Sequence, residues 1–257
     1  MCDVTLILFI LFSAAWQHDK QVKDHRIRLA ASHVVYKSSF YKAEDSILLI
    51  NLHQNESTSV WSAKPVVDSL KKFLFVEIQS DSSRNLTFIY NRKLYQVDPN
   101  RMFTEVGIKA SLESLNKTYP KVLVRRVLDH GRIVRSRFIN KRKLIIALHN
   151  NTNQNYSIKS YLPGEELEKD ASEVHVNKSM DEDDFFYTTS KDLFDALKAK
   201  NYNIILENKK SVIDDGSLSV LCGQIGIAYI NIEAEHGHLH QQRDMLISLQ
   251  AVLSGTN

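Results

Sequence analysis

Cysteine is scarce in this chain, and its scarcity excludes a disulfide-stapled fold. The 257 residues contain two cysteines, Cys2 and Cys222. Cys2 lies in an apolar N-terminal segment that we expect to be removed, which would leave Cys222 alone. A disulfide framework is therefore excluded, and the fold must rest on its core or on a metal. A chain of this length can bury a sizeable core.

Proline and glycine are also sparse, and no segment reads as a linker between domains. The chain has four prolines and eight glycines, no internal repeat and no low-complexity stretch. Turn-forming residues of this kind are the usual punctuation between structural units. We therefore predict one domain over residues 16–257.

Long hydrophobic runs are absent, and the most apolar segment lies at the N-terminus. Nine residues from Val4 to Phe12 are almost wholly apolar and are followed by Ser13, Ala14 and Ala15. This run is too short to span a bilayer, so we expect no stable membrane insertion. It resembles the core and cleavage site of a signal peptide. We predict a signal peptide at residues 1–15 and a secreted or periplasmic protein.

The same N-terminal segment also permits an alternative. Residues 1–15 carry Asp3 and no lysine or arginine, whereas signal peptides usually begin with positive charge. The segment could instead be a buried first strand of a cytoplasmic protein.

A strong excess of charge is missing as well. The net charge is +3, and the basic residues that gather in residues 125–143 share that segment with apolar residues at helical spacing. Such a pattern is typical of a helix with a solvated basic face rather than of a nucleic-acid-binding surface. We expect no nucleic-acid partner, and the oligomeric state is not indicated.

Short apolar runs alternate with segments of helical spacing. Strands are predicted at residues 46–52, 73–79, 85–90, 143–149, 202–208 and 227–234. Helices are predicted at residues 58–72, 120–138, 190–201 and 239–253. This alternation predicts an α/β fold with a mixed, largely parallel central sheet and helices on both faces.

Local signals add detail to these elements. Ser57 or Thr58 can cap the helix at 58–72, and Pro65 inside it predicts a kink or a later start. Gly131 is a possible break in the helix at 120–138. The Asp-Gly pair in "IDDGSLS" (213–219) is typical of a hairpin turn.

Three polar residues stand at the ends of predicted strands. These are His53, His149 and Glu233, and Glu56 follows His53 by three positions in "HQNE". Ligands of parallel sheets bind beyond the carboxyl ends of the strands. Two imidazoles and one carboxylate can supply three zinc ligands and leave a fourth position for water. The alternative for the His-x-x-Glu pair alone is a solvated loop.

Four motifs in this order resemble the zinc carboxypeptidases. They are "HQNE" (53–56), "DPNRMF" (98–103), "LIIALHN" (144–150) and "YINIEAE" (229–235). The resemblance implies the phosphorylase/hydrolase-like α/β fold of that family and a zinc cofactor. The interval before the Asn-Arg pair is shorter than in the family.

The resemblance also implies a role for each matching residue. His53, Glu56 and His149 match the metal ligands, and Glu233 matches the general base and acid. Glu235 is an alternative to Glu233, because residues two apart on a strand point the same way.

Three further residues match positions that contact substrate in the family. Asn100 and Arg101 match the pair that binds the substrate's free carboxylate, and Arg84 matches the arginine that polarises the scissile carbonyl. Arg101 could instead pair with Asp98 in a surface turn. Otherwise we expect Asp98 to brace the turn through backbone amides.

The resulting functional prediction is zinc-dependent hydrolysis of an amide bond next to a free carboxylate. Substrates of this kind include small peptides, N-acyl amino acids and peptides of the bacterial cell wall. The tyrosine that closes over the substrate in the family has no clear match, with Tyr187 and Tyr202 as candidates. The alternative is therefore a catalytically inactive peptide- or glycan-binding protein with the same fold.

Two polar segments stand outside this constellation. The alternating histidines of "HGHLH" (236–240) could form a rival metal site of a phosphatase or esterase, a wall of the pocket or a polar turn. The acidic stretch "DEDDFF" (181–186) could bind calcium, but it lacks the spacing of a calcium loop and is more typical of a solvated loop.

Overall fold

A computed structural model of the protein describes residues 19–41, 46–81, 83–153 and 156–255. The proposed signal peptide lies outside the described residues, so it stays a prediction. None of the helices in the described segments is both long enough and apolar enough to cross a membrane.

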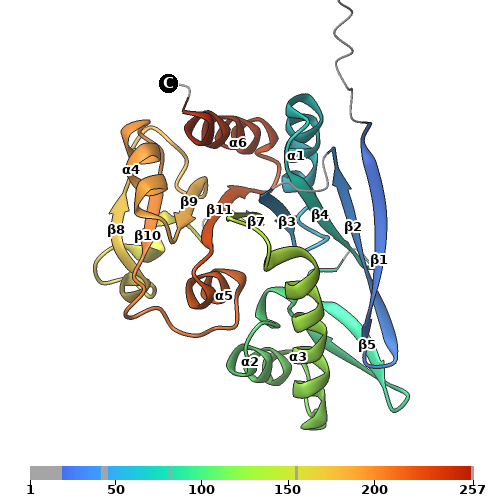
Figure 1. Cartoon of the computed structure of the whole chain (residues 1–257). Coiled ribbons are helices and arrows are strands. Elements are labelled where there is room, and N and C mark those ends of the chain that lie inside the picture. The colour runs from blue at the N-terminus through green and yellow to red at the C-terminus, as the bar shows by residue number, and fades with distance from the viewer. Residues whose placement is uncertain (1–18, 42–45, 82, 154–155, 256–257) are drawn as a thin grey trace, which may run out of the picture.

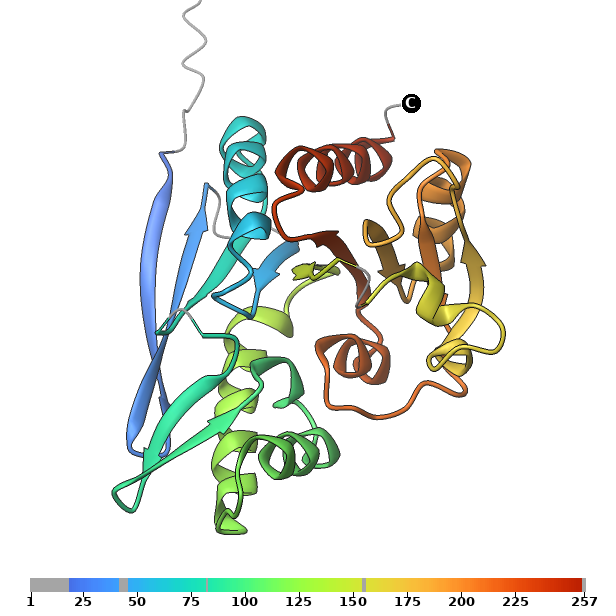
Figure 2. The same cartoon turned by 180° about the vertical axis from the view of Figure 1, so that it is seen from behind.

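Nine strands form one mixed sheet (Figures 1 and 2). Their spatial order is β1 (Gln21–Leu29), β2 (Ser32–Phe40), β4 (Leu74–Gln79), β3 (Ile47–Asn51), β7 (Leu144–Asn151), β11 (Ala228–Glu235), β9 (Phe185–Thr188), β10 (Ile204–Glu207) and β8 (Ala171–His175). The four central strands β4, β3, β7 and β11 run parallel to one another. Antiparallel pairing attaches β2 to β4 and β9 to β11, so the flank of β2 and β1 is antiparallel and the flank of β9, β10 and β8 is mixed.

Helices cover both faces of the sheet, as the sequence predicts. One face carries α1 (Ser57–Leu70), α4 (Lys191–Ala199) and α6 (Leu239–Ser254), and the other carries α2 (Glu105–Leu115), α3 (Val122–Val134) and α5 (Leu218–Ile225) (Figure 1). A small hairpin of β5 (Leu86–Tyr90) and β6 (Lys93–Val97) lies beside α2 and α3. Single turns of 3-10 helix occur at Pro99–Arg101, Ile158–Tyr161 and Glu168–Asp170, and a π-helical turn at Arg135–Ile139.

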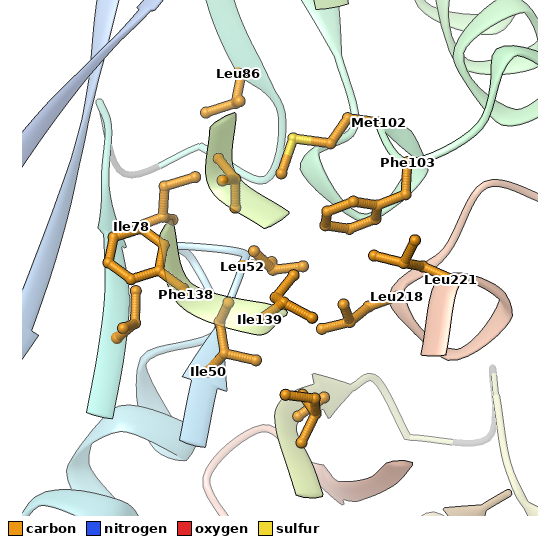
Figure 3. Packing of buried hydrophobic residues seen from close by; sticks show 14 of the residues in the cluster. Ile50, Leu52, Ile78, Leu86, Met102, Phe103, Phe138, Ile139, Leu218 and Leu221 are labelled. Atoms are coloured by element: carbon orange, nitrogen blue, oxygen red, sulfur yellow. The ribbon is translucent and has the colours of Figure 1, made fainter. Parts of the chain in front are cut away.

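The core explains why the central strands read as unbroken apolar runs. In β3, Leu48, Leu49 and Ile50 are all fully buried. Leu49 packs under α1 and α6, whereas Leu48 and Ile50 face the cluster under α2, α3 and α5. Figure 3 shows that second cluster, where Ile50 and Leu52 lie opposite Met102 and Leu218. A parallel strand covered on both faces is apolar along most of its length.

Two local predictions around the helices need correction. Neither Ser57 nor Thr58 caps α1, because the helix already begins at Ser57 and its N-cap position is Glu56, whose side chain makes no capping bond. Helix α3 also runs through Gly131 without a break. A Cβ at Gly131 would lie 2.4 Å from the backbone oxygen of Met102, so glycine is needed there for close packing.

The hairpin predicted at residues 213–219 is wrong. This segment is a loop that leads into α5, and Ser217 caps that helix by accepting a hydrogen bond from the Val220 backbone. Gly216 has a positive φ and its backbone nitrogen donates to Oδ1 of Asp214 at 3.0 Å, but no strands flank the Asp-Gly pair. In Figure 1 the loop passes below α5 on its way from β10.

Candidate metal centre and pocket

His53 and Glu56 lie in the connection between β3 and α1. Strand β3 ends at Asn51, and the backbone then turns so that the Glu56 nitrogen donates to the His53 oxygen at 3.1 Å. This turn brings both side chains back over the end of the sheet. The Nδ1 atom of His53 lies 2.9 Å from Oε1 of Glu56.

His149 joins them from the neighbouring strand β7. Its Nδ1 atom lies 2.9 Å from Oε2 of Glu56 and 3.3 Å from Nδ1 of His53. All three residues are buried, and together they form a group whose ligand atoms could share one metal ion. In a tetrahedral zinc site with bonds of about 2.0–2.1 Å, two ligand atoms are about 3.3 Å apart. The side chains present therefore fit a zinc ion in both chemistry and spacing.

Asp98 holds the outer nitrogen of His53. The Nε2 atom of His53 lies 2.8 Å from Oδ1 of Asp98, which also accepts a hydrogen bond from the Asn100 backbone at 2.7 Å. The bond to Asn100 is the expected bracing of the turn, whereas the contact with His53 was not predicted. A carboxylate in this position fixes the ring's tautomer and orientation, as it does behind most metal-binding histidines.

The electrostatics of the group favour positive charge at its centre. Burial alone would raise the pKa of the Glu56 carboxyl, but His53 and His149 outweigh it and hold that pKa well below its usual range. Burial alone would lower the pKa of His53, but Glu56 and Asp98 raise it to about 9. For His149 burial prevails, and its pKa is lowered. A cation at this point is therefore stabilised by two carboxylates.

Arg84 lies at the open side of the group. Its Nη1 atom donates to Oε1 of Glu56 at 2.5 Å, and its Nη2 atom is 3.7 Å from Oδ2 of Asp98. The side chain is 48% exposed, so solvent and ligands can reach it. The structure thus brings Arg84 to the candidate ligands, where it faces the pocket.

Glu233 faces His149 across the pair β7 and β11. The two residues are register partners, and Glu233 is 5% exposed. Oε2 of Glu233 accepts a hydrogen bond from Nδ2 of Asn231 at 2.9 Å. Burial raises the pKa of Glu233 to about 8, and the nearby charge of Glu56 adds to the effect. The carboxyl can therefore gain or lose a proton near neutral pH.

One cavity of about 750 Å³ joins these side chains. Six residues predicted from the sequence line it, namely Glu56, Arg84, Asn100, Arg101, His149 and Glu233. His53 is fully buried behind them. Arg101 pairs with Asp215 at 3.3 Å, and not with Asp98 as the alternative for a surface turn supposed. Asn100 is anchored because its Oδ1 accepts from the Leu218 backbone at 3.0 Å.

Tyrosines form much of the remaining wall, and the sequence patterns did not identify most of them. Tyr156, Tyr161, Tyr187 and Tyr229 line the cavity. Tyr187, a predicted candidate, is buried and donates to Oε2 of Glu207 at 3.0 Å. Tyr202, the other candidate, lies outside the lining and shares a hydrogen bond with Ser248 of α6 on the opposite face. Tyr187 and Asn231 are register partners in β9 and β11, a pairing that the sequence patterns did not predict.

Two buried amide oxygens also belong to the cavity wall. Oδ1 of Asn151 and Oδ1 of Asn231 have no hydrogen-bond partner among the described residues. A buried acceptor without a partner costs free energy, so each is a natural place for a ligand's N–H group to bind.

The histidines at residues 236–240 form a polar turn before α6, which was one of the three alternatives, and not a site of three imidazole ligands. Among the described residues, His236 and His240 belong to no group with metal-binding spacing, and both are exposed. His238 instead contacts the acidic stretch at residues 181–184.

Comparison with known proteins places the fold. No protein-family model and no curated protein sequence matches the chain. Its structure is similar to thrombin-activatable fibrinolysis inhibitor, with a TM-score of 0.50 and 13% identity over 91% of this chain and 69% of that one. An aspartoacylase family protein from Mesorhizobium loti gives a TM-score of 0.47 and 12% identity over 91% and 67% of the two chains. Carboxypeptidase A from Helicoverpa armigera gives 0.45 and 10% over 91% and 68%.

These likenesses concern the fold. At such low identity, the first shows only that the chain shares the fold of that protein, and the sheet itself is the mixed α/β arrangement that the sequence predicts.

Proposed function

We propose that this protein is a zinc-dependent hydrolase that cleaves an amide bond next to a free carboxylate. The observation that carries the proposal is the buried group of His53, Glu56 and His149, with Glu233 beside it in one pocket. Two imidazoles and one carboxylate are a ligand set typical of catalytic zinc sites, where a fourth position stays open.

The acid–base chemistry of the proposal falls to Glu233. Zinc held by the three ligands would supply Lewis-acid polarisation of the carbonyl and a lowered pKa of water. Glu233 takes a proton from the attacking water and delivers it to the leaving amine, for which a pKa near the working pH is best. Its raised pKa of about 8 and its burial both support this role.

The two arginines of the pocket have different tasks in this proposal. Arg84 is half-exposed beside the ligand group, where its positive charge would stabilise the negative charge that develops on the substrate oxygen. Arg101 binds the substrate's carboxylate by a two-pronged hydrogen bond. Its present partner Asp215 is 42% exposed, so a substrate carboxylate can replace that contact.

The pocket's size and its acceptors support a small amide substrate. A cavity of about 750 Å³ is within the range of small-molecule sites. The free oxygens of Asn151 and Asn231 can accept N–H groups of a peptide or an N-acyl amino acid. We therefore propose short peptides, including those of the bacterial cell wall, or N-acyl amino acids as the substrate class.

One observation favours a second candidate, a binding protein without catalytic activity. Tyr187 is buried and held by Glu207, and Tyr202 lies away from the pocket, so neither can close over a substrate. A protein with this pocket could bind peptides or glycans and release them unchanged. Binding of a peptide without its hydrolysis would support this candidate.

The proposal is tested by metal content and hydrolysis together. Purified protein is expected to hold zinc, to hydrolyse dipeptides or N-acyl amino acids, and to lose activity to a chelator and regain it on adding zinc. His53→Ala should lose activity together with the zinc of the buried group, whereas a variant of the exposed His236 should keep both. Less than about a tenth of an equivalent of zinc, with no hydrolysis after zinc is added, contradicts the proposal.

A further inference from the structure

A second group of metal-ligand residues lies at the same edge of the sheet, outside the pocket. It joins the loop of residues 181–184, just before β9, to the turn between β11 and α6. Asp181, Glu235 and His238 each offer a ligand atom, and these atoms lie within 4.8 Å of one another. None of the three lines the cavity around Glu233.

The imidazole of His238 is held by a buried carboxylate. Nδ1 of His238 lies 3.1 Å from Oδ2 of Asp184, which is 2% exposed. Asp184 is itself fixed, because its Oδ1 accepts a hydrogen bond from the Glu235 backbone at 3.0 Å. A ring nitrogen that donates to a buried carboxylate leaves the other nitrogen, Nε2, as a metal ligand, and this arrangement is the usual support of metal-binding histidines.

The free side of the ring faces Glu235 at a distance that suits two ligands of one ion. Nε2 of His238 is 3.6 Å from Oε2 of Glu235, which is too long for a hydrogen bond. Two ligands of a tetrahedral zinc ion are about 3.3 Å apart, given bonds of about 2.0–2.2 Å.

We propose that Asp181, Glu235 and His238 form a second divalent-cation site, with Asp184 as the residue that orients His238. One nitrogen and two carboxylate ligands favour zinc over calcium or magnesium, which prefer oxygen ligands alone. The site is structural, since it lies outside the pocket and ties the loop before β9 to the end of β11. Gly237 in the same turn donates to Oγ1 of Thr58, so the site also steadies the start of α1.

Zinc content of the full-length protein, measured after dialysis against dilute zinc, tests this site. His238→Gln and Asp181→Asn are each expected to lose about one equivalent relative to wild type, and His53→Gln to keep at least one. His236→Gln is the matched control, because it changes an exposed histidine of the same segment and should retain the wild-type zinc content. Circular dichroism of each variant checks that the fold is intact.

The result does not depend on the proposed hydrolase. If His53→Gln holds no zinc, or if His238→Gln and Asp181→Asn keep the wild-type content, the second site is refuted and His238 is only an ion-pair partner of Asp184. If the chain holds zinc only through Asp181 and His238, the proposed catalytic site fails while the second site stands.

Discussion

Glu233 and Glu235 point to the same side of β11, yet they belong to different regions of the molecule. Glu233 lies in the buried pocket opposite His149 and has a pKa raised by burial to about 8. Glu235 is partly exposed, accepts a hydrogen bond from Asn153 and lies beside His238. One step of two residues, about 6.6 Å along a strand, separates the two environments.

The difference shows how burial assigns chemistry to similar side chains. In the buried group every charge has a partner, since an unpaired charge there would cost several kcal/mol. Glu56, for example, accepts hydrogen bonds from Arg84, His149 and the Asn150 backbone. In the outer group water can solvate Asp181 and part of His238. The inner region can therefore shift the pKa values of its groups strongly, whereas the groups of the outer region are partly solvated.

Exchanging each glutamate for glutamine tests most directly whether Glu233 and Glu235 have different roles. Glu233→Gln is expected to reduce kcat by about 10²- to 10⁴-fold, the usual contribution of a general acid–base group, with zinc content unchanged. The measurement is steady-state hydrolysis with metal analysis of the same samples. A larger loss of hydrolysis in Glu235→Gln than in Glu233→Gln would reverse the assignment of the base.

A substitution of Arg101 tests how the pocket binds the substrate's carboxylate. Arg101→Lys keeps the charge but loses the two-pronged hydrogen bond. The transition state should therefore lose about 2 kcal/mol of stabilisation, which lowers kcat/KM roughly thirtyfold. The loss should appear with substrates that carry a free carboxylate and largely vanish with amidated analogues. Equal losses on both substrates would show that Arg101 supports the fold rather than binding the carboxylate.

The two carboxylates behind the histidines allow a matched test of both regions. Asp98→Asn should weaken zinc binding at the buried group by about tenfold or somewhat more, and Asp184→Asn should do the same at the outer group. Only Asp98→Asn should lower hydrolysis at limiting zinc. Zinc titrations of each variant measure the effect, and unchanged affinity in either one would remove the supporting role of that carboxylate.

A pH dependence of stability is also expected. Glu233 has a pKa of about 8 when folded, against 4.5 for an unperturbed glutamate. Between these values the unfolded chain binds fewer protons at this position, so the carboxyl's contribution to stability is present at low pH and is lost as pH rises. The slope is at most about 1.4 kcal/mol per pH unit.

Urea unfolding of zinc-stripped protein from about pH 5 to pH 7 measures this slope. The quantity to compare is the difference in the free energy of unfolding between wild type and Glu233→Gln, because pH effects common to both proteins cancel in it. As pH rises, the free energy of unfolding of the wild type should fall relative to that of Glu233→Gln. Glu235→Gln is the control, and an equal pH trend in both variants would contradict the contrast between the two glutamates.

The sequence predicted the covered centre of the fold better than its flanks. β3, β4, β7 and β11 were recognisable because strands buried on both faces are continuously apolar. The β1–β2 hairpin was missed, since one side of "QVKDHRIRL" is exposed and its charges hide the strand. The Asp-Gly pair at 215–216 caused the opposite error, a predicted hairpin that does not form, because a turn signal does not say whether strands flank it.

The site divides in a similar way. Residues at strand ends could be predicted to meet, because parallel strands deliver their carboxyl ends to one edge. The contact of Asp98 with His53 could not, since it joins a 3-10 turn to a strand end 45 residues away. The pair of Asp184 and His238 likewise joins two loops whose separate patterns did not indicate that they meet. Such contacts depend on loop geometry that no periodicity encodes.

The place of β11 in the sheet has a consequence for folding during synthesis. It is the last described strand in the chain, yet it lies between β7 and β9 near the middle of the sheet. Until residues 228–235 leave the ribosome, the edges of β7 and β9 have no partner, and unpaired apolar edges invite association with other chains. Glu233 arrives with that same strand. Closure of the sheet and completion of the pocket are therefore one late event, and an incomplete chain would be prone to aggregate before it could act on any substrate.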